Sequence, residues 1–343
     1  MRRYRSWSTD APPVSVPQRF GIRGASQLRR DLAAMVRGVA SGTRFGLNLG
    51  SAGLLRPDLS LPAYAGRVPV DGIAPIFNFF DRARGGRGFR STVQRSTDLR
   101  DWRGGRLSYD EHDGTDFVCP PGTQLVAAAP GVVVASRDTW TRGGLTLCVD
   151  HGDGVVTQYT HLQGMIAELG ERVERGQAIA WSGVSGVDMT QFFPWVPPHV
   201  HFMVWIDGQP VDPYRAPGET GPGAWLHGND PRTATGALAD DPSPSSIRPE
   251  VDRAALARVV EACPDRALRA ELEAAPDPLA LAAIVEDSLH HDAYVWPEAL
   301  RGVRVRPRGE PGRVRLTLPL PADTYRGASA GDAPWTRPAR ATS

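Results

Sequence analysis

The sequence predicts a mainly β protein, in which an antiparallel, sandwich-like β domain precedes a smaller module of helices and a β-hairpin. Residues 89–216 contain many short runs of branched and aromatic residues, separated by Gly and Pro turns and without a long helical period. From residue 249 the apolar residues change to helical spacing. The stretch 217–248 between them is rich in Pro, Gly, Ser and Asp, which is typical of a flexible linker.

Residues 1–88 are predicted to be an N-terminal extension with one amphipathic helix. Residues 1–24 are polar and contain Pro, which favours an extended arm. Apolar residues recur at helical spacing over 26–40, with Ser26 as the expected N-cap. Residues 43–88 are punctuated by Gly and Pro, and we expect their apolar run 73–80 to wrap around the β domain.

The C-terminal module is predicted over residues 249–322. Three apolar-periodic stretches between 251 and 289 are separated by prolines and predict two or three short helices. Residues 302–320 alternate around Gly309-Glu310-Pro311-Gly312, which predicts a hairpin. The final segment, 323–343, is rich in Pro, Gly, Arg and Ala and is predicted to be disordered.

Composition narrows the class of protein. A length of 343 residues allows two domains, and a net charge of +1 argues against a nucleic-acid surface. Cys119, Cys148 and Cys263 lack any paired spacing and are predicted to be small reduced hydrophobes. No run of about 18 apolar residues is present, and the first thirty residues contain no apolar signal-peptide core, so neither a membrane span nor a signal peptide is predicted.

Five residues that commonly bind metals gather in the middle third of the chain: His112, Asp116, His161, His199 and His201. Neutral imidazole and carboxylate are usual ligands of Zn²⁺, and a catalytic zinc site takes three of them while a water keeps the fourth position. Such a site would leave two histidines for chemistry. One His-x-His alone is more often a pair of solvated strand residues, but the joint occurrence of all five favours a metal site.

The spacing of these residues predicts how they converge. If 199–205 is a strand, His199 and His201 project from the same face and can reach one ion. Tyr159 and His161 are also two apart in a strand-like run, so we expect a second converging pair.

His112 and Asp116 are four residues apart across Gly114. This spacing fits one helical turn or a bent loop that leads into a strand at residue 117. The Gly and the prolines that follow favour the loop.

From Tyr109 to Tyr214 the sequence resembles the lysostaphin and LytM type of zinc endopeptidase, which cuts peptidoglycan cross-bridges or stem peptides and has the duplicated-hybrid-motif fold. The matching motifs occur in family order. They are His-x-Gly-x-Asp at 112–116, Pro-Gly-Thr at 121–123, Ala-Ala-Ala-Pro-Gly-Val-Val at 127–133, His-Gly-Asp-Gly at 151–154, Tyr-Thr-His-Leu at 159–162, Gly-Glu-Arg-Val at 170–173, Arg-Gly-Gln at 175–177 and Pro-His-Val-His-Phe at 198–202.

Carried over by position, the resemblance implies that His112, Asp116 and His201 bind Zn²⁺, and that His161 and His199 are catalytic. It implies hydrolysis of a peptide bond by a zinc-bound water that the two histidines assist. Which of the two acts as the general base stays open. The alternative is a non-catalytic module that keeps the fold and binds wall peptide or regulates a partner.

The sequence departs from the family at residues 187–196, an aromatic insertion that leaves the substrate preference undetermined. Tyr109 could donate its hydroxyl to an oxyanion, although an ordinary surface tyrosine is the favoured interpretation.

The other histidines are predicted to be structural or solvated. His151 flanks a turn, and His227 lies in a Gly-rich loop. His290 and His291 end an apolar helix, where imidazoles are favourable because of the helix dipole, with a second metal site as the less favoured alternative.

The inferred substrate lies outside the cytoplasm. We therefore expect a soluble chain that is made in the cytoplasm and meets peptidoglycan after release or guided export.

Overall fold

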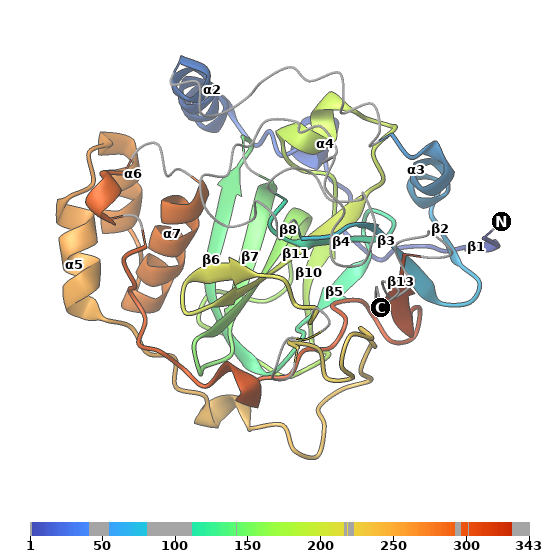
Figure 1. Cartoon of the computed structure of the whole chain (residues 1–343). Helices are drawn as coiled ribbons and strands as arrows, with labels where there is room; N and C mark the ends of the chain where they lie inside the picture. The colour runs from blue at the N-terminus through green and yellow to red at the C-terminus, as the bar shows by residue number, and fades with distance from the viewer. Residues whose placement is uncertain are drawn as a thin grey trace, which may run out of the picture.

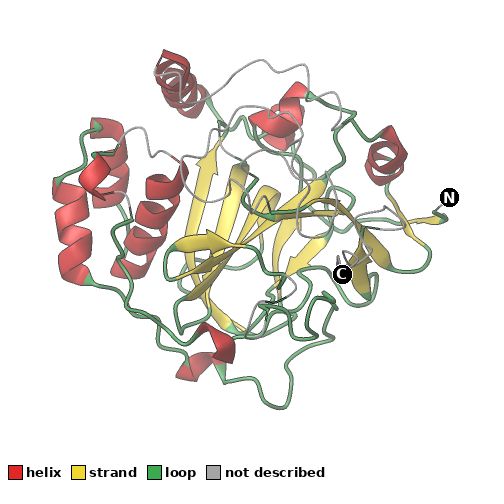
Figure 2. Ribbon diagram, viewed as in Figure 1, coloured by secondary structure: helices red, strands yellow, loops and turns green. Residues whose placement is uncertain are grey.

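The structure of the chain is a computed structural model that describes residues 2–40, 55–80, 112–141, 143–215, 218, 223–291, 296–300 and 302–330. Its centre is an 11-stranded sheet with the main strand order β13-β3-β4-β11-β8-β7-β6-β9. In addition, β12 pairs with β11, and β10 pairs with β5 and β8. Figures 1 and 2 show this sheet in the middle of the molecule, with the helices around it. The mainly β class predicted from the sequence is confirmed.

The strands include those expected around the five candidate residues. They are β1 (Tyr4–Ser6), β2 (Arg67–Pro69), β3 (Ile73–Asn78), β4 (Thr115–Val118), β5 (Gln124–Val126), β6 (Gly131–Thr139), β7 (Gly144–Asp150), β8 (Val155–Met165), β9 (Arg172–Val173), β10 (Ala178–Ser182), β11 (His199–Ile206), β12 (Gln209–Val211) and β13 (Gly327–Ser329). The helices are α1 (Val16–Arg19), α2 (Ala25–Ala40), α3 (Pro57–Tyr64), α4 (Val187–Gln191), α5 (Arg253–Glu261), α6 (Arg266–Glu273) and α7 (Pro278–His291).

Neighbouring strands of the large sheet run antiparallel, with the parallel pair β13 and β3 as the exception. The hairpin between β7 and β8 shows why the sequence folds in this way. Its turn places Gly152, Asp153 and Gly154 at φ values of 76°, 49° and 74°, which glycine and aspartate tolerate better than most residues. The strand that follows begins with Val155 and Val156, which favour extended backbone.

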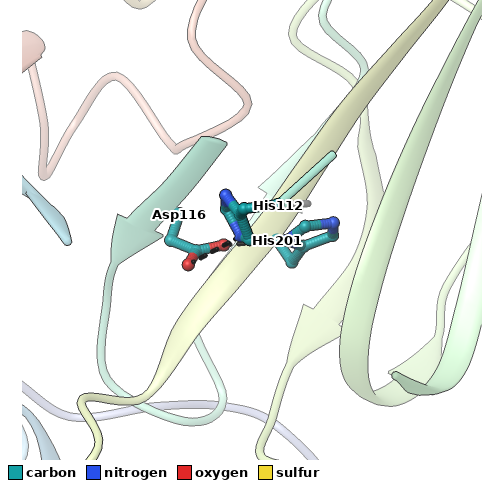
Figure 3. A group of neighbouring side chains, drawn as sticks. All are labelled: His112, Asp116 and His201. Atoms are coloured by element: carbon teal, nitrogen blue, oxygen red, sulfur yellow. Dashed lines mark hydrogen bonds and ion pairs between the residues drawn. The ribbon is translucent and has the colours of Figure 1, made fainter. Parts of the chain in front are cut away.

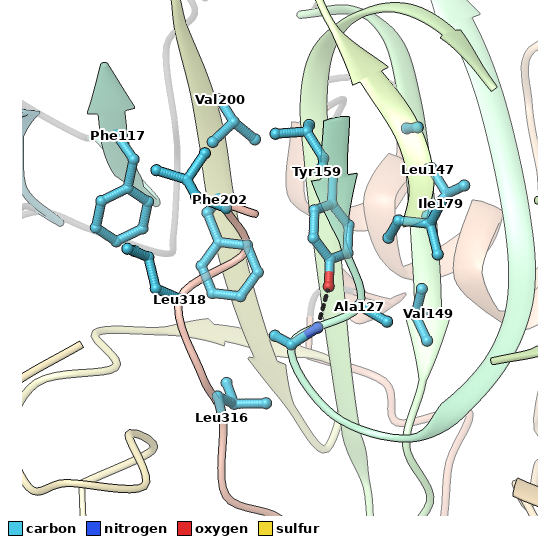
Figure 4. Close-up of a cluster of buried hydrophobic side chains, with 14 of the residues drawn as sticks. Phe117, Ala127, Leu147, Val149, Tyr159, Ile179, Val200, Phe202, Leu316 and Leu318 are labelled. Carbon is cyan, nitrogen blue, oxygen red and sulfur yellow. Dashed lines mark hydrogen bonds between the residues drawn. The ribbon is translucent and has the colours of Figure 1, made fainter. Parts of the chain in front are cut away.

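One face of the sheet carries the main hydrophobic core. Figure 4 shows part of this cluster, which comes from β4, β7, β8, β10 and β11 and from residues 316–318. Tyr159 is fully buried there, and its hydroxyl accepts a hydrogen bond of 2.9 Å from the Ala128 N–H. Burial of large apolar side chains is the main stabilising term of such a core.

The N-terminal extension contains the helix that the sequence predicted. The helix α2 begins at Ala25, so Ser26 lies inside it and is not its N-cap. The expected extended arm also contains α1 and β1, and β1 pairs with β2. The segment 73–80 does more than wrap around the β domain, because β3 pairs with β4 and so extends the main sheet.

The aromatic insertion forms α4 and a turn that packs near α3. The rings of Tyr64 and Phe193 lie edge to face, with centroids 5.0 Å apart. Phe193 and Trp195 are each 47% exposed.

The segment expected to be a flexible linker lies against the β domain from residue 223 onward. Trp225 is fully buried, and its ring stacks on Phe202 with centroids 5.8 Å apart. Arg175 forms a bidentate ion pair with Asp241, with distances of 2.7 and 2.6 Å. Burying a side chain as large as Trp225 offsets the entropy lost in ordering such a segment.

The prediction of a hairpin over 302–320 is wrong, because the described residues of this range form no pair of strands. Leu316 and Leu318 lie in the core of the β domain, and the Leu316 N–H bonds to the Ala224 carbonyl at 2.8 Å. Residues of the predicted disordered tail are also ordered as far as 330, because β13 pairs with β3 and Tyr325 is buried. Residues 331–343 lie outside the described residues.

The helices α5 to α7 form their own small core, and Figure 1 shows them together on one side of the sheet, beside β6. Buried ion pairs fasten them to the sheet: Arg137 of β6 contacts Asp287 of α7, and Arg306 contacts both Asp150 of β7 and Glu286 of α7. Among the helices that the structure describes, none is both long and apolar enough to span a bilayer.

Candidate metal centre

Three of the predicted site residues converge on one point (Figure 3). His112 Nε2 lies 3.2 Å from Asp116 Oδ2, and His201 Nδ1 lies 2.8 Å from Asp116 Oδ1. One ligand atom from each residue falls within 4.8 Å of the other two. The fold produces this arrangement because β4 and β11 are antiparallel neighbours in which Asp116 and His201 are directly paired. His112 lies in the loop before β4, as Gly114 of the motif predicted.

Hydrogen bonds fix the orientation of the two imidazoles. His112 Nδ1 lies 2.7 Å from the Phe79 carbonyl oxygen, which can only accept, so Nδ1 carries the proton and Nε2 faces Asp116. His201 has the opposite arrangement: its Nε2 lies 3.1 Å from Asp113 Oδ1, and its Nδ1 faces Asp116. Such second partners set the tautomer and the ring orientation of histidines that bind metals.

His161 and His199 lie beside this group. Each donates its Nδ1–H to a backbone carbonyl, His161 to Ser185 at 2.8 Å and His199 to Pro197 at 2.7 Å. Their rings are 4.9 Å apart, and His199 Nε2 lies 3.5 Å from Asp116 Oδ1. Both rings therefore present Nε2 on the side of the site.

His161 reaches the site through an unusual backbone conformation. Its φ of 63° lies in the left-handed region, which is uncommon for a residue other than glycine and occurs often at functional sites. The expectation that Tyr159 and His161 converge as a pair is therefore wrong, because Tyr159 points into the core. The pair His199 and His201 does share one face, since both contact Asp116.

The electrostatics favour a cation at the centre of the group. Burial opposes the charged form of Asp116, but its interactions with His112, His199 and His201 outweigh burial, so the pKa of Asp116 lies well below its usual range. Burial, with smaller contributions from His199 and His201, lowers the pKa of His161 to about 3. Burial likewise lowers the pKa of His199. Both imidazoles are therefore neutral near pH 7.

The residues fit a divalent metal. Two imidazole nitrogens and one carboxylate are the donor set of many catalytic zinc sites, and they leave a coordination position for water. Burial lowers the pKa of His201, but the hydrogen bonds to Asp113 and Asp116 outweigh burial and raise this pKa to about 10. A metal ion would displace that proton on binding.

Gly114 contributes space to the site. A Cβ atom on this residue would lie only 2.7 Å from His201 Cε1 and 2.9 Å from the Phe202 carbonyl oxygen. The motif glycine is thus explained by the close approach of the His201 ring.

The sequence interpretation missed several contributors. Asp113 lies next to His112 but has no partner at a recognisable spacing, and the carbonyls of Phe79, Ser185 and Pro197 carry no side-chain signal at all. Tyr109, for which a role in catalysis was weighed, lies outside the described residues.

The remaining histidines differ in environment. His151 is buried beside the turn, as expected, where it donates to the Pro130 carbonyl and contacts the Thr157 hydroxyl, both at 2.8 Å. His227 is exposed. His290 and His291 do end α7, but their rings reach Asp113, which the sequence did not indicate.

Comparison with known proteins identifies a matching family for the region that contains the candidate site. Residues 110–213 match the family model described as peptidase family M23, and this range contains all five candidate residues. Peptidoglycan DD-endopeptidase ShyA of Vibrio cholerae is 35% identical over 105 residues, which are 31% of this chain and 23% of ShyA. Glycyl-glycine endopeptidase ALE-1 of Staphylococcus capitis is 36% identical over 92 residues, which are 26% of this chain and 24% of ALE-1.

Among solved structures, the catalytic domain of lysostaphin from Staphylococcus simulans is 29% identical, and the match covers 30% of this chain and 77% of that domain with a TM-score of 0.26. The chain spans about a quarter of the length of the curated relatives it matches. Residues 110–213 of this chain thus match peptidase family M23.

Proposed function

We propose that the chain is a zinc-dependent endopeptidase that hydrolyses peptide bonds of peptidoglycan, in its cross-bridges or stem peptides. The observation that carries the proposal is that the four family-type histidines gather around Asp116, with hydrogen bonds that fix each imidazole. Relatives whose names describe peptidoglycan endopeptidases support the substrate class.

In this proposal His112, Asp116 and His201 hold the zinc ion. When bound, zinc supplies a Lewis acid that polarises the scissile carbonyl and makes a water more acidic. The protein's own contribution is orientation: Phe79 fixes His112 and Asp113 fixes His201, so the ligand atoms are already together before an ion binds.

His161 and His199 would transfer the proton and stabilise the developing negative charge. Because Nδ1 of each ring is committed to a carbonyl, Nε2 is the atom that accepts a proton from the attacking water or returns it to the leaving amine. Once protonated, the same Nε2 can donate a hydrogen bond to the oxyanion of the tetrahedral intermediate. The two neutral, buried rings suit either role, and the proposal assigns the two roles to them jointly.

Metal analysis tests the ligand assignment. His112→Ala, Asp116→Ala and His201→Ala should each lose the ion of this site together with activity, because a three-residue donor set does not tolerate removal of one member. His227→Ala serves as the control, since it removes an exposed imidazole. Full retention of this ion in any of the three variants would refute the assignment for that residue.

Turnover separates the catalytic pair from the ligands. His161→Ala and His199→Ala should keep the metal yet lose turnover by about 10²-fold or more, the usual contribution of general acid–base catalysis. Wild-type turnover in either variant would remove that residue from the mechanism.

The substrate is tested by digesting several purified types of peptidoglycan and identifying the fragments by mass spectrometry. Cleavage within cross-bridges or stem peptides supports an endopeptidase, whereas release of a terminal amino acid alone indicates a carboxypeptidase. Binding to the polymer without any new fragment from the metal-loaded protein supports the alternative, a non-catalytic wall-binding or regulatory module.

The place of action is a further part of the proposal. Since the proposed substrate is peptidoglycan, the chain should act outside the cytoplasmic membrane. Fractionation of producing cells, followed by mass analysis of the intact protein, checks this expectation; activity confined to the cytoplasmic fraction would contradict it.

A further inference from the structure

A second group of metal-ligating side chains adjoins the first, because Asp113 contacts His201. Asp113, His290 and His291 each offer one ligand atom, and these atoms lie within 4.8 Å of one another. The mechanism proposed above does not use the two histidines. We propose that this group is a second site for a divalent metal of the zinc class, and that the ion joins α7 to the loop of the first site.

The distances in the two groups are alike. Asp113 Oδ2 lies 2.7 Å from His290 Nε2 and 3.2 Å from His291 Nε2. In the first group the carboxylate oxygens of Asp116 lie 2.8 and 3.2 Å from their imidazole nitrogens. A tetrahedral ion with bonds of about 2.0 to 2.2 Å requires ligand atoms roughly 3.3 to 3.6 Å apart, so modest adjustment suffices in both groups.

The orientation of the rings also fits a metal site. His291 Nδ1 lies 3.0 Å from Asp287 Oδ1 and 3.1 Å from the Asp287 carbonyl oxygen, which directs Nε2 toward Asp113. Asp287 is held in turn by Arg137. This is the carboxylate–histidine–metal arrangement found in established zinc sites, where the second carboxylate fixes the tautomer and makes the imidazole a better ligand.

His290 is positioned by packing. Its ring meets the ring of Trp205 edge to face, with centroids 5.4 Å apart, and it also lies edge to face with the ring of His291 at 4.7 Å. Asp113, His290 and His291 are each less than 10% exposed. Charged and polar groups with so little access to water are stabilised when they are paired or bind an ion.

The donor set limits the type of metal. Two imidazole nitrogens and one carboxylate oxygen suit Zn²⁺ and similar divalent transition metals better than Ca²⁺ or Mg²⁺, which prefer oxygen ligands. Three protein ligands leave one coordination position for a water.

The second site would be coupled to the first through Asp113. Its Oδ2 faces His290 and His291, while its Oδ1 accepts a hydrogen bond from His201 Nε2. An ion bound to Oδ2 would hold this carboxylate, and with it the His201 ring, in a fixed position. The helix α7 would then help to position His201 without contacting the substrate.

Metal content of the full chain tests the inference. After dialysis against Zn²⁺, the wild-type protein should hold two ions, and His112→Ala should hold one. A His290→Gln/His291→Gln double variant should also hold one, whereas combining it with His112→Ala should leave none. His227→Ala is the matched control and should hold two. One ion in the wild-type protein and none in His112→Ala would overturn the inference.

Thermal unfolding of His112→Ala tests the second site without the His290→Gln/His291→Gln double variant, so the test does not require that double variant to fold. In His112→Ala, saturating Zn²⁺ should still raise Tm by about 5 °C or more, because an ion that binds only the folded state stabilises it. A Tm of His112→Ala that does not respond to Zn²⁺ would overturn the second site. Neither result depends on peptidase activity, so failure of the proposed function and failure of this inference are distinguishable.

Discussion

Replacing Gly114 by alanine is the sharpest steric test of the candidate site. The new Cβ would lie 2.7 Å from His201 Cε1, 2.8 Å from His201 Nε2 and 2.9 Å from the Phe202 carbonyl oxygen. The backbone of Gly114 is not in the left-handed region, so alanine is compatible with its conformation and the effect is one of space alone.

The required movement follows from the distances. Ordinary van der Waals contact begins near 3.4 Å, so the His201 ring must retreat by 0.7 Å, the difference between 3.4 and 2.7 Å. The Phe202 carbonyl belongs to β11 and cannot yield easily, because this strand is bonded to β4 and β8 on its two sides. A displacement of about 1 Å at a catalytic site can cost roughly 10²-fold in rate. We therefore expect Gly114→Ala to lower turnover by about this factor and zinc affinity by about tenfold or more.

The assays are a zinc competition titration with a chromophoric chelator, and turnover on peptidoglycan fragments. Gly164→Ala is the matched control, because a Cβ there would meet its nearest neighbour, Trp181 Cδ1, at an ordinary 3.7 Å. Zinc affinity and turnover of Gly114→Ala equal to those of Gly164→Ala would refute the account of this glycine and of the His201 position.

Three further predictions concern stability. Burial lowers the pKa of His151 from 6.5 to about 4, so the unfolded chain binds a proton at this residue at a higher pH than the folded chain does. As pH falls from 6.5 to 4, this difference of about 2.5 pKa units should lower the free energy of unfolding by about 3 kcal/mol. Urea unfolding at several pH values gives the free energy of unfolding, which should fall less steeply between pH 6.5 and 4 in His151→Gln than in the wild-type protein. The same dependence on pH in both proteins would exclude His151 as its source. Tyr159→Phe should cost about 1–3 kcal/mol by depriving the buried Ala128 N–H of its partner, measured by the same method, and no loss would contradict that hydrogen bond. Asp265→Ala should cost about 1 kcal/mol, because the Asp265 carboxylate caps α6 through the N–H groups of residues 267 and 268, and Asp265→Asn should restore most of it; equal loss in both variants would argue against capping.

Local patterns predicted the parts of the site that depend on local geometry. The period of a strand places His199 and His201 on one face whatever the neighbouring strands are, and Gly114 indicates a loop between His112 and Asp116. The position of His161 could not be predicted in this way, because it depends on a φ of 63° and on the carbonyl of Ser185, 24 residues further along the chain.

The C-terminal half shows a second limit. Alternation of apolar residues around 314–318 predicts extended chain, but it does not identify the partner, and here Leu316 and Leu318 pack on the β domain. The contact between Asp113 and His290 joins residues 177 positions apart. The local sequence around either residue does not predict this contact.

The pairing of β13 with β3 has a consequence for the order of folding. Arg2 donates hydrogen bonds to the carbonyls of Ile73 and Ser329, so this edge of the sheet joins residues from both ends of the described chain. A nascent chain cannot complete the edge until residue 329 has left the ribosome, although the strands carrying the five candidate residues are synthesised long before. Until then β3 presents unpaired backbone groups of the kind through which sheets aggregate. Protection of this edge is thus delayed until residue 329 has been synthesised, and a chain cut short before β13 would keep it exposed.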